Sequence, residues 1–209
     1  MLQLSRRTLL GGAVSLGVAM ATEDASLGAE TRLIYDFTLP LVGWESVSGR
    51  WQIERMGDAA NGVALVQRAT RNPFNVLVAP AGAFTNVDIS TRFKPISGRE
   101  DASGGIVFRF DKGRYYVVRA NALEDNFNFY FYEQGRRQIA GASAKAPALG
   151  QWHTLRVTAD GDRIRGWLND QPLLEQKDSR FASGQVGLWT KADSVTAFES
   201  LIIAPIGRS

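Results

Sequence analysis

The stretch at residues 86–95, NVDISTRFKP, indicates the class of secondary structure in this chain. Its side chains suited to burial occupy every second position, and polar side chains stand between them. The first set is Val87, Ile89, Thr91 and Phe93. A period of two is typical of a β-strand with one buried and one hydrated face, whereas a surface helix needs a period near 3.6. The stretch therefore predicts a strand that covers a core.

Similar short runs follow one another from residue 31 onward, separated by turn formers such as Asp-Lys-Gly and Asp-Gly-Asp, and no stretch predicts an amphipathic helix. A dozen strands without helices for parallel crossovers favour antiparallel sheets packed face to face. The chain has 209 residues, 44% of them hydrophobic, which suits one domain. We therefore expect an all-β fold, an antiparallel β-sandwich of the jelly-roll type, formed by residues 30–206 as a single domain.

The first 29 residues have the pattern of an export signal. Ser5, Arg6 and Arg7 precede an apolar run that contains glycine and is too short to span a bilayer, and Ala19-Met20-Ala21 offers a small-x-small cleavage pattern. This order resembles a twin-arginine signal. We expect residues 1–29 to be this signal and a short leader, and the mature protein to be periplasmic or secreted, without an integral membrane segment. An uncleaved anchor and a chance basic N-terminus are the alternatives.

Composition excludes several kinds of site and partner. The chain has no cysteine, so disulfides, thiol nucleophiles and thiolate metal sites are excluded. The formal charge of +3 falls to +1 without Arg6 and Arg7, which gives no reason to expect nucleic acid or an anionic membrane as a partner. His153, the single histidine, shares the side-chain row of Leu155 and Val157, so we expect it to be structural. We expect no metal and no cofactor.

Three runs, at residues 104–110, 115–121 and 126–133, carry polar side chains between their core positions. If they are consecutive antiparallel strands, these side chains meet on one surface. Guanidinium, amide and aromatic groups together suit a sugar, whose hydroxyls need planar hydrogen-bonding partners and whose C–H face packs on a ring. The alternative is a hydrated sheet face without a ligand. The side chains predicted to bind substrate here are Arg109, Tyr115, Arg119, Asn121, Asn126, Asn128 and Tyr130.

A second polar stretch is GQVGLWTKADSVTAF at residues 184–198. Alternation directs Val186 and Leu188 inward, which places Trp189 and Lys191 on the opposite face, with Asp193 in the following turn. Trp189 would then stack on a ligand, or alternatively pack against a neighbouring strand in a second apolar layer.

The blocks YYVVRANALEDNFNFYFYE (115–133) and GQVGLWTKADSVTAFESLII (184–203), with GIVFRF and GQWHTLRV, resemble the concanavalin A-like lectin/glucanase domain of the 3-keto-disaccharide hydrolase type. The resemblance extends over nearly all of residues 31–204. It implies a jelly roll of two curved sheets with the ligand on the concave face. It also places the ligand site among matching residues, which are Arg109, Tyr115, Arg119, Asn121, Glu124, Asn126, Trp189, Lys191 and Asp193.

The carboxylates do not match ordinary retaining hydrolysis. Glycosidases of this broad fold place two glutamates on one strand face, but Glu124 and Asp125 are adjacent and would point to opposite faces. In a 3-keto sugar the proton beside the carbonyl is acidic, so elimination would need one base and a cation for the enolate. Glu124 or Asp193 would be the base, with Lys191, Arg119 or Arg109 as the cation. Surface ion pairs, or a turn cap for Asp193, are the alternatives.

These observations predict an exported domain that recognises a carbohydrate or a keto-sugar and name no protein partner. One alternative is a hydrolase or lyase acting on glycosides or 3-keto disaccharides, with Glu124, Asp193 and Lys191 as catalytic residues. The other is a non-catalytic module that binds carbohydrate or protein. The second predicts that Arg109, Arg119 and Glu124 are locked in structural pairs.

Overall fold

The structure is a computed structural model that describes residues 32–207, so the expected export signal lies outside the described residues. No helix in this range is long and apolar enough to cross a membrane. The regular elements described are strands, which confirms the all-β expectation: β1 (Leu33–Tyr35), β2 (Glu45–Ser48), β3 (Trp51–Arg55), β4 (Val63–Gln67), β5 (Phe74–Val78), β6 (Val87–Ser97), β7 (Ser103–Asp111), β8 (Arg114–Asn121), β9 (Asn126–Glu133), β10 (Arg136–Ser143), β11 (His153–Asp160), β12 (Arg163–Leu168), β13 (Gln171–Lys177), β14 (Gln185–Lys191) and β15 (Val195–Pro205).

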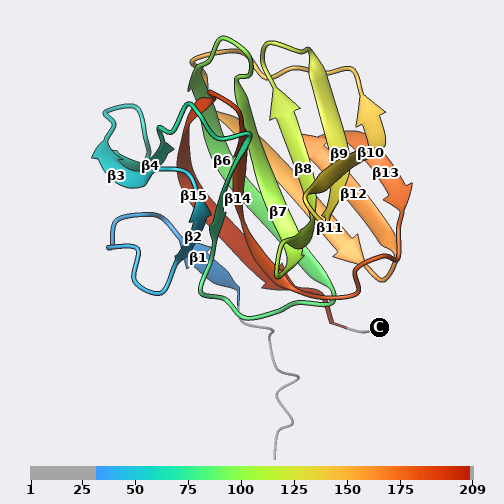
Figure 1. Ribbon diagram of the computed structural model, residues 1–209. Coiled ribbons are helices and arrows are strands. Elements are labelled where there is room, and N and C mark those ends of the chain that lie inside the picture. Colours follow the sequence, from blue (N-terminus) through green and yellow to red (C-terminus); the bar gives the residue numbers. More distant parts are fainter. Residues whose placement is uncertain (1–31, 208–209) are drawn as a thin grey trace, which may run out of the picture.

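The strands form two antiparallel sheets that pack face to face as a jelly-roll sandwich (Figure 1). The eight-stranded sheet has the order β13-β12-β11-β6-β15-β4-β3, and β1 pairs with β15. The seven-stranded sheet has the order β10-β9-β8-β7-β14-β5-β2. Some neighbours in each sheet come from distant parts of the chain, as when β14 lies between β5 and β7.

Strand β6 confirms the alternation that predicted the fold. Val87, Ile89, Thr91 and Phe93 are buried, whereas Arg92 between them is exposed. β6 lies inside its sheet, between β11 and β15, so its backbone is hydrogen-bonded on both sides. The residues of the buried row reach the core between the sheets.

The core fills the space between the two sheets. Phe93, Leu155 and Phe198 come from the eight-stranded sheet, and Phe129 and Leu188 come from the seven-stranded sheet. His153 belongs to the edge of this layer, where its ring nitrogens lie 2.9 Å from the carbonyl oxygen of Ala148 and 3.0 Å from Asn169 Nδ2. These contacts confirm the structural role expected for His153.

Strands β7, β8 and β9 are consecutive antiparallel neighbours, as the sequence predicted. Tyr116 and Val118 point into the core, whereas Tyr115 and Val117 point to the outer face of the seven-stranded sheet. That outer face carries a second apolar layer of its own. The layer consists of Val76, Val78, Val107, Phe110, Tyr115, Val117, Tyr130 and Trp189. Both faces of this sheet are therefore packed.

A β-bulge in β7 changes the side-chain alternation. The register of the β7–β8 pair shifts between Phe108 and Asp111, and Arg109 has a left-handed backbone with φ of 50°. An extra residue in a strand reverses which face the following side chains occupy. Phe110 consequently packs on the outer face rather than in the central core where alternation placed it.

Candidate functional site

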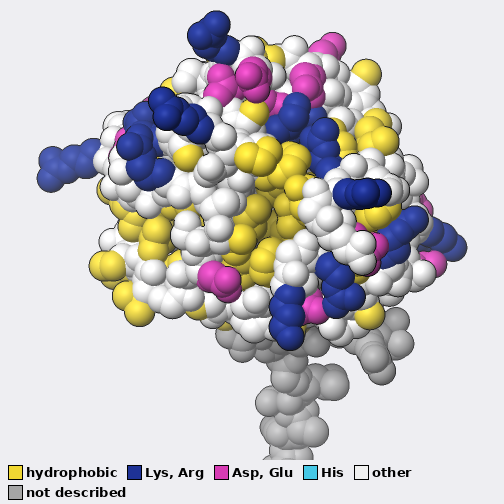
Figure 2. Space-filling model, viewed as in Figure 1, with side chains coloured by type: hydrophobic (Ala, Val, Ile, Leu, Met, Phe, Trp, Pro, Cys, Tyr) yellow, Lys and Arg dark blue, Asp and Glu magenta, His cyan; other side chains and the backbone are white. Residues whose placement is uncertain are grey.

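The outer face of the seven-stranded sheet contains a hollow, with hydrophobic side chains on its floor and basic side chains at its rim (Figure 2). We call it the aromatic hollow and define it by Phe74, Val76, Phe110, Tyr115 and Tyr132. Its volume is about 370 Å³, within the size range of ligand pockets. Further residues complete its wall: Val47, Ser48, Asn72, Pro73, Gly113 and Gly135.

The rings of the hollow come from four strands, β5, β7, β8 and β9, and pack against one another. Tyr115 of β8 and Tyr132 of β9 are directly opposite in the ladder, and their rings stack in parallel at 4.9 Å. Phe110 of β7 stacks on the other side of Tyr115 at 5.7 Å. Phe74 of β5 meets Tyr132 edge to face at 5.1 Å. The result is a rigid apolar floor with phenol groups among its rings.

Arg137 of β10 lies at one side of this floor. Its guanidinium carbon is 4.5 Å from the ring centre of Tyr130 and 5.4 Å from that of Phe74. Arg137 is opposite Tyr132 in the ladder, which places it on the same face as the hollow. A cation in contact with two ring faces is favourable in itself and also keeps the side chain in one position.

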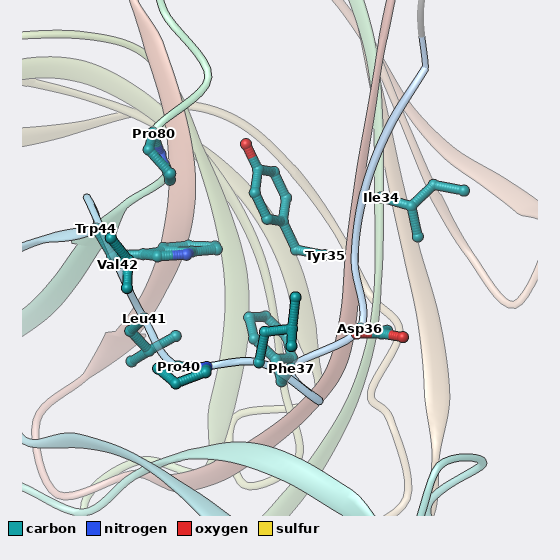
Figure 3. Close-up of a pocket in the computed structure, with 10 residues that line it drawn as sticks. Ile34, Tyr35, Asp36, Phe37, Pro40, Leu41, Val42, Trp44 and Pro80 are labelled. Carbon is teal, nitrogen blue, oxygen red and sulfur yellow. The ribbon is translucent and has the colours of Figure 1, made fainter.

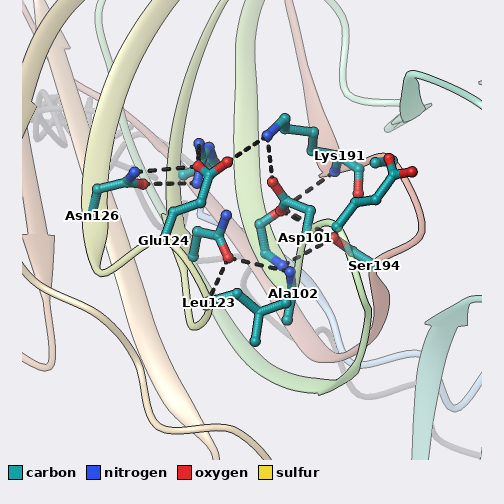
Figure 4. Close-up of polar contacts among 12 residues, drawn as sticks. Asp101, Ala102, Leu123, Glu124, Asn126, Lys191 and Ser194 are labelled. Atoms are coloured by element: carbon teal, nitrogen blue, oxygen red, sulfur yellow. Dashed lines mark hydrogen bonds and ion pairs between the residues drawn. The ribbon is translucent and has the colours of Figure 1, made fainter.

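Four charged residues form an ion-pair cluster on the same sheet face, and we define it as Asp101, Arg119, Glu124 and Lys191 (Figure 4). Glu124 Oε2 accepts from Arg119 Nη2 at 2.6 Å, and Glu124 Oε1 accepts from Lys191 Nζ at 2.8 Å. The same Lys191 Nζ lies 2.7 Å from Asp101 Oδ2. The two cations and two carboxylates thus neutralise one another.

The pairing fixes the protonation states of this cluster. Burial alone would raise the pKa of Glu124, but hydrogen bonds from Lys191 and Arg119 outweigh it and lower the pKa to about 2. Burial alone would lower the pKa of Lys191, but its bonds to Asp101 and Glu124 raise it above the usual value. Glu124 is therefore an anion and Lys191 a cation near neutral pH. Both are far from the pKa that a general base or acid needs.

Asp193 has a different position from the one expected of a catalytic base. Its carboxylate accepts hydrogen bonds from the backbone N–H groups of Arg99, Glu100 and Asp101 at 2.7, 3.0 and 3.1 Å. Burial acts to raise the pKa of Asp193, but these three bonds lower it below the ordinary value. Asp193 therefore caps backbone N–H groups, in agreement with the alternative of a turn cap.

The predicted amide and tyrosine residues surround Arg119. Arg119 donates to Asn126 Oδ1 at 2.9 Å and to the hydroxyl of Tyr130 at 3.0 Å, and Asn128 donates to the same hydroxyl at 2.6 Å. Asn121 Oδ1 accepts from the backbone N–H groups of residues 102 and 123, so it holds the turn between β8 and β9. The structure therefore brings Arg119, Asn126, Asn128 and Tyr130 together with Glu124 and Lys191 as a bonded network, whereas Asn121 bonds only to backbone groups.

Trp189 does lie on the predicted face, but its expected exposure to a ligand is wrong. The side chain has 0% exposure. Phe74 stacks over it at 5.5 Å, and Gly105 of the neighbouring strand leaves the space that Trp189 and Arg119 occupy, since a Cβ at Gly105 would lie 3.3 Å from the indole. The chain supplies its own stacking partner for Trp189. Packing in a second apolar layer, the alternative stated above, describes its role.

The expected position of Arg109 is also wrong. Because of the bulge in β7, its guanidinium points away from the aromatic hollow and donates to the carbonyl oxygens of Phe181, Thr85 and Gly161 at 2.8, 2.9 and 2.6 Å. Only 2% of Arg109 is exposed, and burial lowers its pKa. It holds three loops together at the end of the sandwich and forms no part of the cluster around Arg119.

Sequence reasoning missed part of the hollow. Alternation along FNFYFYE places Tyr132 on the outer face, but Tyr132 is not among the site residues predicted from the sequence. Phe74, Val76 and Val78 alternate within FNVLV, which would have placed them on one face. The meeting of Phe74 with Tyr132 joins β5 to β9 across three intervening strands, and no local pattern indicates it. Arg137 was missed for the same reason.

A second cavity lies at the N-terminal edge of the sandwich and has a volume of about 380 Å³. Tyr35 points into the space between Trp44 and Pro80, whereas the side chains of Ile34 and Asp36 point away from it (Figure 3). Tyr35 and Trp44 meet edge to face at 5.0 Å. Its lining is almost wholly apolar and contains none of the predicted site residues.

Two sequence comparisons identify relatives of the chain. The model of the 3-keto-alpha-glucoside-1,2-lyase-like domain matches residues 40–202, which confirms the resemblance found in the sequence. Levanase from Bacillus subtilis (strain 168) is 26% identical over 170 residues, which are 79% of this chain. The chain spans only 23% of the length of that levanase.

Solved structures share the architecture. The carbohydrate binding module CBM66 from Bacillus subtilis has a TM-score of 0.66 and 22% identity, over 76% of this chain and 93% of the module. A Bacillus subtilis protein of unknown function with a galectin-like fold has a TM-score of 0.62 and 14% identity, over 81% of this chain and 92% of its own. At these identities the likeness concerns the fold.

Proposed function

Since the chain belongs to the 3-keto-alpha-glucoside-1,2-lyase-like domain family, we propose that it is a carbohydrate-binding domain whose ligand occupies the aromatic hollow. The observation that carries this proposal is the hollow itself. The partly exposed rings of Phe74 and Tyr132 offer apolar surface to the C–H groups of a sugar, and phenol and guanidinium donors stand beside them. The levanase and CBM66 likenesses support a glycan as the ligand.

The proposal favours binding without catalysis. Glu124, Lys191 and Asp193, the residues proposed from the sequence as catalytic, are held in ion pairs or on backbone N–H groups. A carboxylate with a pKa of about 2 is a weak base for the proton beside a ketone. We assign the ion-pair cluster a supporting role. It holds Arg119, which donates to the hydroxyl of Tyr130, and the ring of Tyr130 in turn contacts Arg137 beside the hollow.

Calorimetry with a glycan panel that includes levan and 3-keto-glucosides tests the proposal. Tyr132→Ala removes a ring of the hollow, so we expect it to weaken binding about tenfold or more while the fold remains. Trp44→Ala is the matched control, because it removes a half-buried aromatic ring from the other cavity. Equal effects of the two variants, or no binding to any glycan, would refute the proposal.

Turnover of the 3-keto-glucosides distinguishes the catalytic alternative. We expect no product from the native protein or from Glu124→Gln. Product formed by the native protein and lost in Glu124→Gln, with affinity retained, would establish the eliminative lyase with Glu124 as its base.

We further propose that the domain acts outside the cytoplasm. The paired Arg6-Arg7 before a mild apolar run supports export by the twin-arginine route. Replacing both residues with lysine should leave the protein inside the cell, as fractionation and immunoblotting would show. Unchanged export of that variant would refute this route.

A further inference from the structure

Arg137 is a cation without a carboxylate partner among residues 32–207, in contrast to three other arginines on or near this sheet. Arg119 is paired with Glu124, Arg114 with Asp111 and Arg180 with Asp178. The described contacts of Arg137 are instead with the rings of Tyr130 and Phe74. Its charge is therefore balanced by no described neighbour, while the adjacent ion-pair cluster is neutral.

The contacts with the two rings leave the N–H groups of Arg137 without a hydrogen-bond partner among the described residues. A guanidinium is planar, and contact with aromatic rings involves its face, whereas its N–H groups point outward in the plane. That edge forms no hydrogen bond to any residue that the structure describes. A planar pair of N–H donors matches the two oxygens of a carboxylate or of a sulfate ester. The arginine is held in position, yet its donors are free.

Two phenol groups add to this set of donors. The hydroxyls of Tyr116 and Tyr130 have hydrogen-bond partners. The hydroxyl of Tyr115 lies beside the indole N–H of Trp189, which acts to lower its pKa, but neither this hydroxyl nor that of Tyr132 donates a hydrogen bond to a described residue. The rings of Tyr115 and Tyr132 stack at 4.9 Å and Arg137 is opposite Tyr132 in the ladder, so the three groups are neighbours. Burial raises the pKa of both phenols. The phenols are therefore protonated near neutral pH and able to donate to an anion.

We propose that the glycan bound in the aromatic hollow carries one anionic group, a uronate carboxylate or a sulfate ester, which Arg137 holds with help from the hydroxyls of Tyr115 and Tyr132. This inference rests on the proposed carbohydrate-binding function. The rings pack against the sugar, and the guanidinium edge selects its charge. The ligand class is thus an acidic glycan rather than a neutral one.

The test compares oligosaccharides that differ only in charge. Calorimetry would use a uronic acid oligosaccharide against its carboxyl-reduced counterpart, and a sulfated oligosaccharide against its desulfated counterpart. For at least one pair we expect the acidic form to bind about tenfold to a hundredfold more tightly, and the difference to shrink as salt is added. The pair that shows the preference identifies the anionic group.

Variants then assign the preference to Arg137. Arg137→Gln should abolish it, Arg137→Lys should keep only part of it because the planar fork is lost, and Tyr132→Phe should reduce it while the ring stays. Arg136→Gln is the matched control: it removes the same charge from the neighbouring position of β10, whose side chain points to the other face.

The outcomes separate this inference from the proposed function. If neutral and acidic forms bind equally, or if Arg136→Gln and Arg137→Gln lose the same affinity, the hollow binds sugar without charge selection and Arg137 only covers the rings. If no oligosaccharide of either kind binds, the carbohydrate-binding function itself fails.

Discussion

Glu124 shows how a single side chain links the electrostatics of this sheet face to stability. Two cations hold its carboxylate, and one of them, Arg119, is 1% exposed. A guanidinium buried to this degree needs fixed acceptors for its N–H groups, and Glu124 supplies the anionic one for Arg119. Glu124 is therefore better described as the counter-ion of Arg119 and Lys191 than as a reactive group.

The depressed pKa of Glu124 predicts a pH dependence of stability. Its folded pKa of about 2 lies below the ordinary 4.5, so its contribution is complete above pH 4.5 and is lost as the pH falls toward 2. Glu124→Gln should lower the free energy of unfolding by about 1 to 2 kcal/mol at pH 7, a figure reduced for partial exposure. Urea denaturation at pH 7, 4.5, 3 and 2 should show the two proteins converging. A difference that stays constant down to pH 2 would contradict this role.

At the scale of the element, the bulge of β7 converts Arg109 into a clamp. Its guanidinium satisfies three carbonyl oxygens from separate segments, so its removal leaves acceptors buried without donors. We expect Arg109→Met to reduce the free energy of unfolding by about 2 to 4 kcal/mol. The control is Arg114→Met, which breaks an exposed pair with Asp111 and should cost at most about 0.5 kcal/mol. Chemical denaturation measures both, and equal costs would contradict the clamp.

Close approach of β7 to β6 predicts a second effect at this scale. A Cβ at Gly104 would lie 2.3 Å from Cδ2 of the fully buried Phe93. Gly104→Ala should therefore destabilise the fold by about 1 to 3 kcal/mol through overpacking. Gly57, whose added Cβ would meet no atom within 4 Å, is the control, and Gly57→Ala should change stability by less than about 0.5 kcal/mol. Thermal melts of both variants would measure the contrast.

The same elements show what the sequence could predict. Alternation gave the correct faces of β6, β8 and β9, because each of these strands stays in register through the residues concerned. It failed at Arg109, because nothing in the sequence GIVFRFD indicates that a residue other than glycine adopts a left-handed backbone conformation there. It also failed for the exposure of Trp189, because its cover comes from Phe74, more than a hundred residues earlier in the chain. Local pattern predicts faces, whereas long-range contact decides exposure.

For the whole molecule, the two faces of the seven-stranded sheet have separate tasks. The inner face contributes Phe129 to the core that both sheets share, and the outer face contributes Tyr132 to the aromatic hollow. Mutations on the inner face should therefore change stability, whereas substitutions at the partly exposed rings of the hollow, Phe74 and Tyr132, should change the proposed binding more than the stability.

This division predicts the behaviour of Phe129→Ala. Because one core joins both sheets, the variant should unfold in a single transition with about 3 to 5 kcal/mol less stability. Circular dichroism and fluorescence during denaturation should give coincident curves. Two separated transitions would show that the sheets unfold independently, and a loss below about 1 kcal/mol would mean that Phe129 is not in the core.

Alternation along β8 and β9 also limits how the residues of the aromatic hollow can change during evolution. Core residues and hollow residues occupy alternate positions of the same strands, so inserting or deleting one residue inside a strand would exchange the two sets. New specificity is thus accessible by substitution at alternate positions, while changes in length are confined to the turns at residues 112–113, 122–125 and 134–135. We expect relatives with other ligands to differ at the hollow positions and in these turns, while the core-facing positions of β8 and β9 stay apolar.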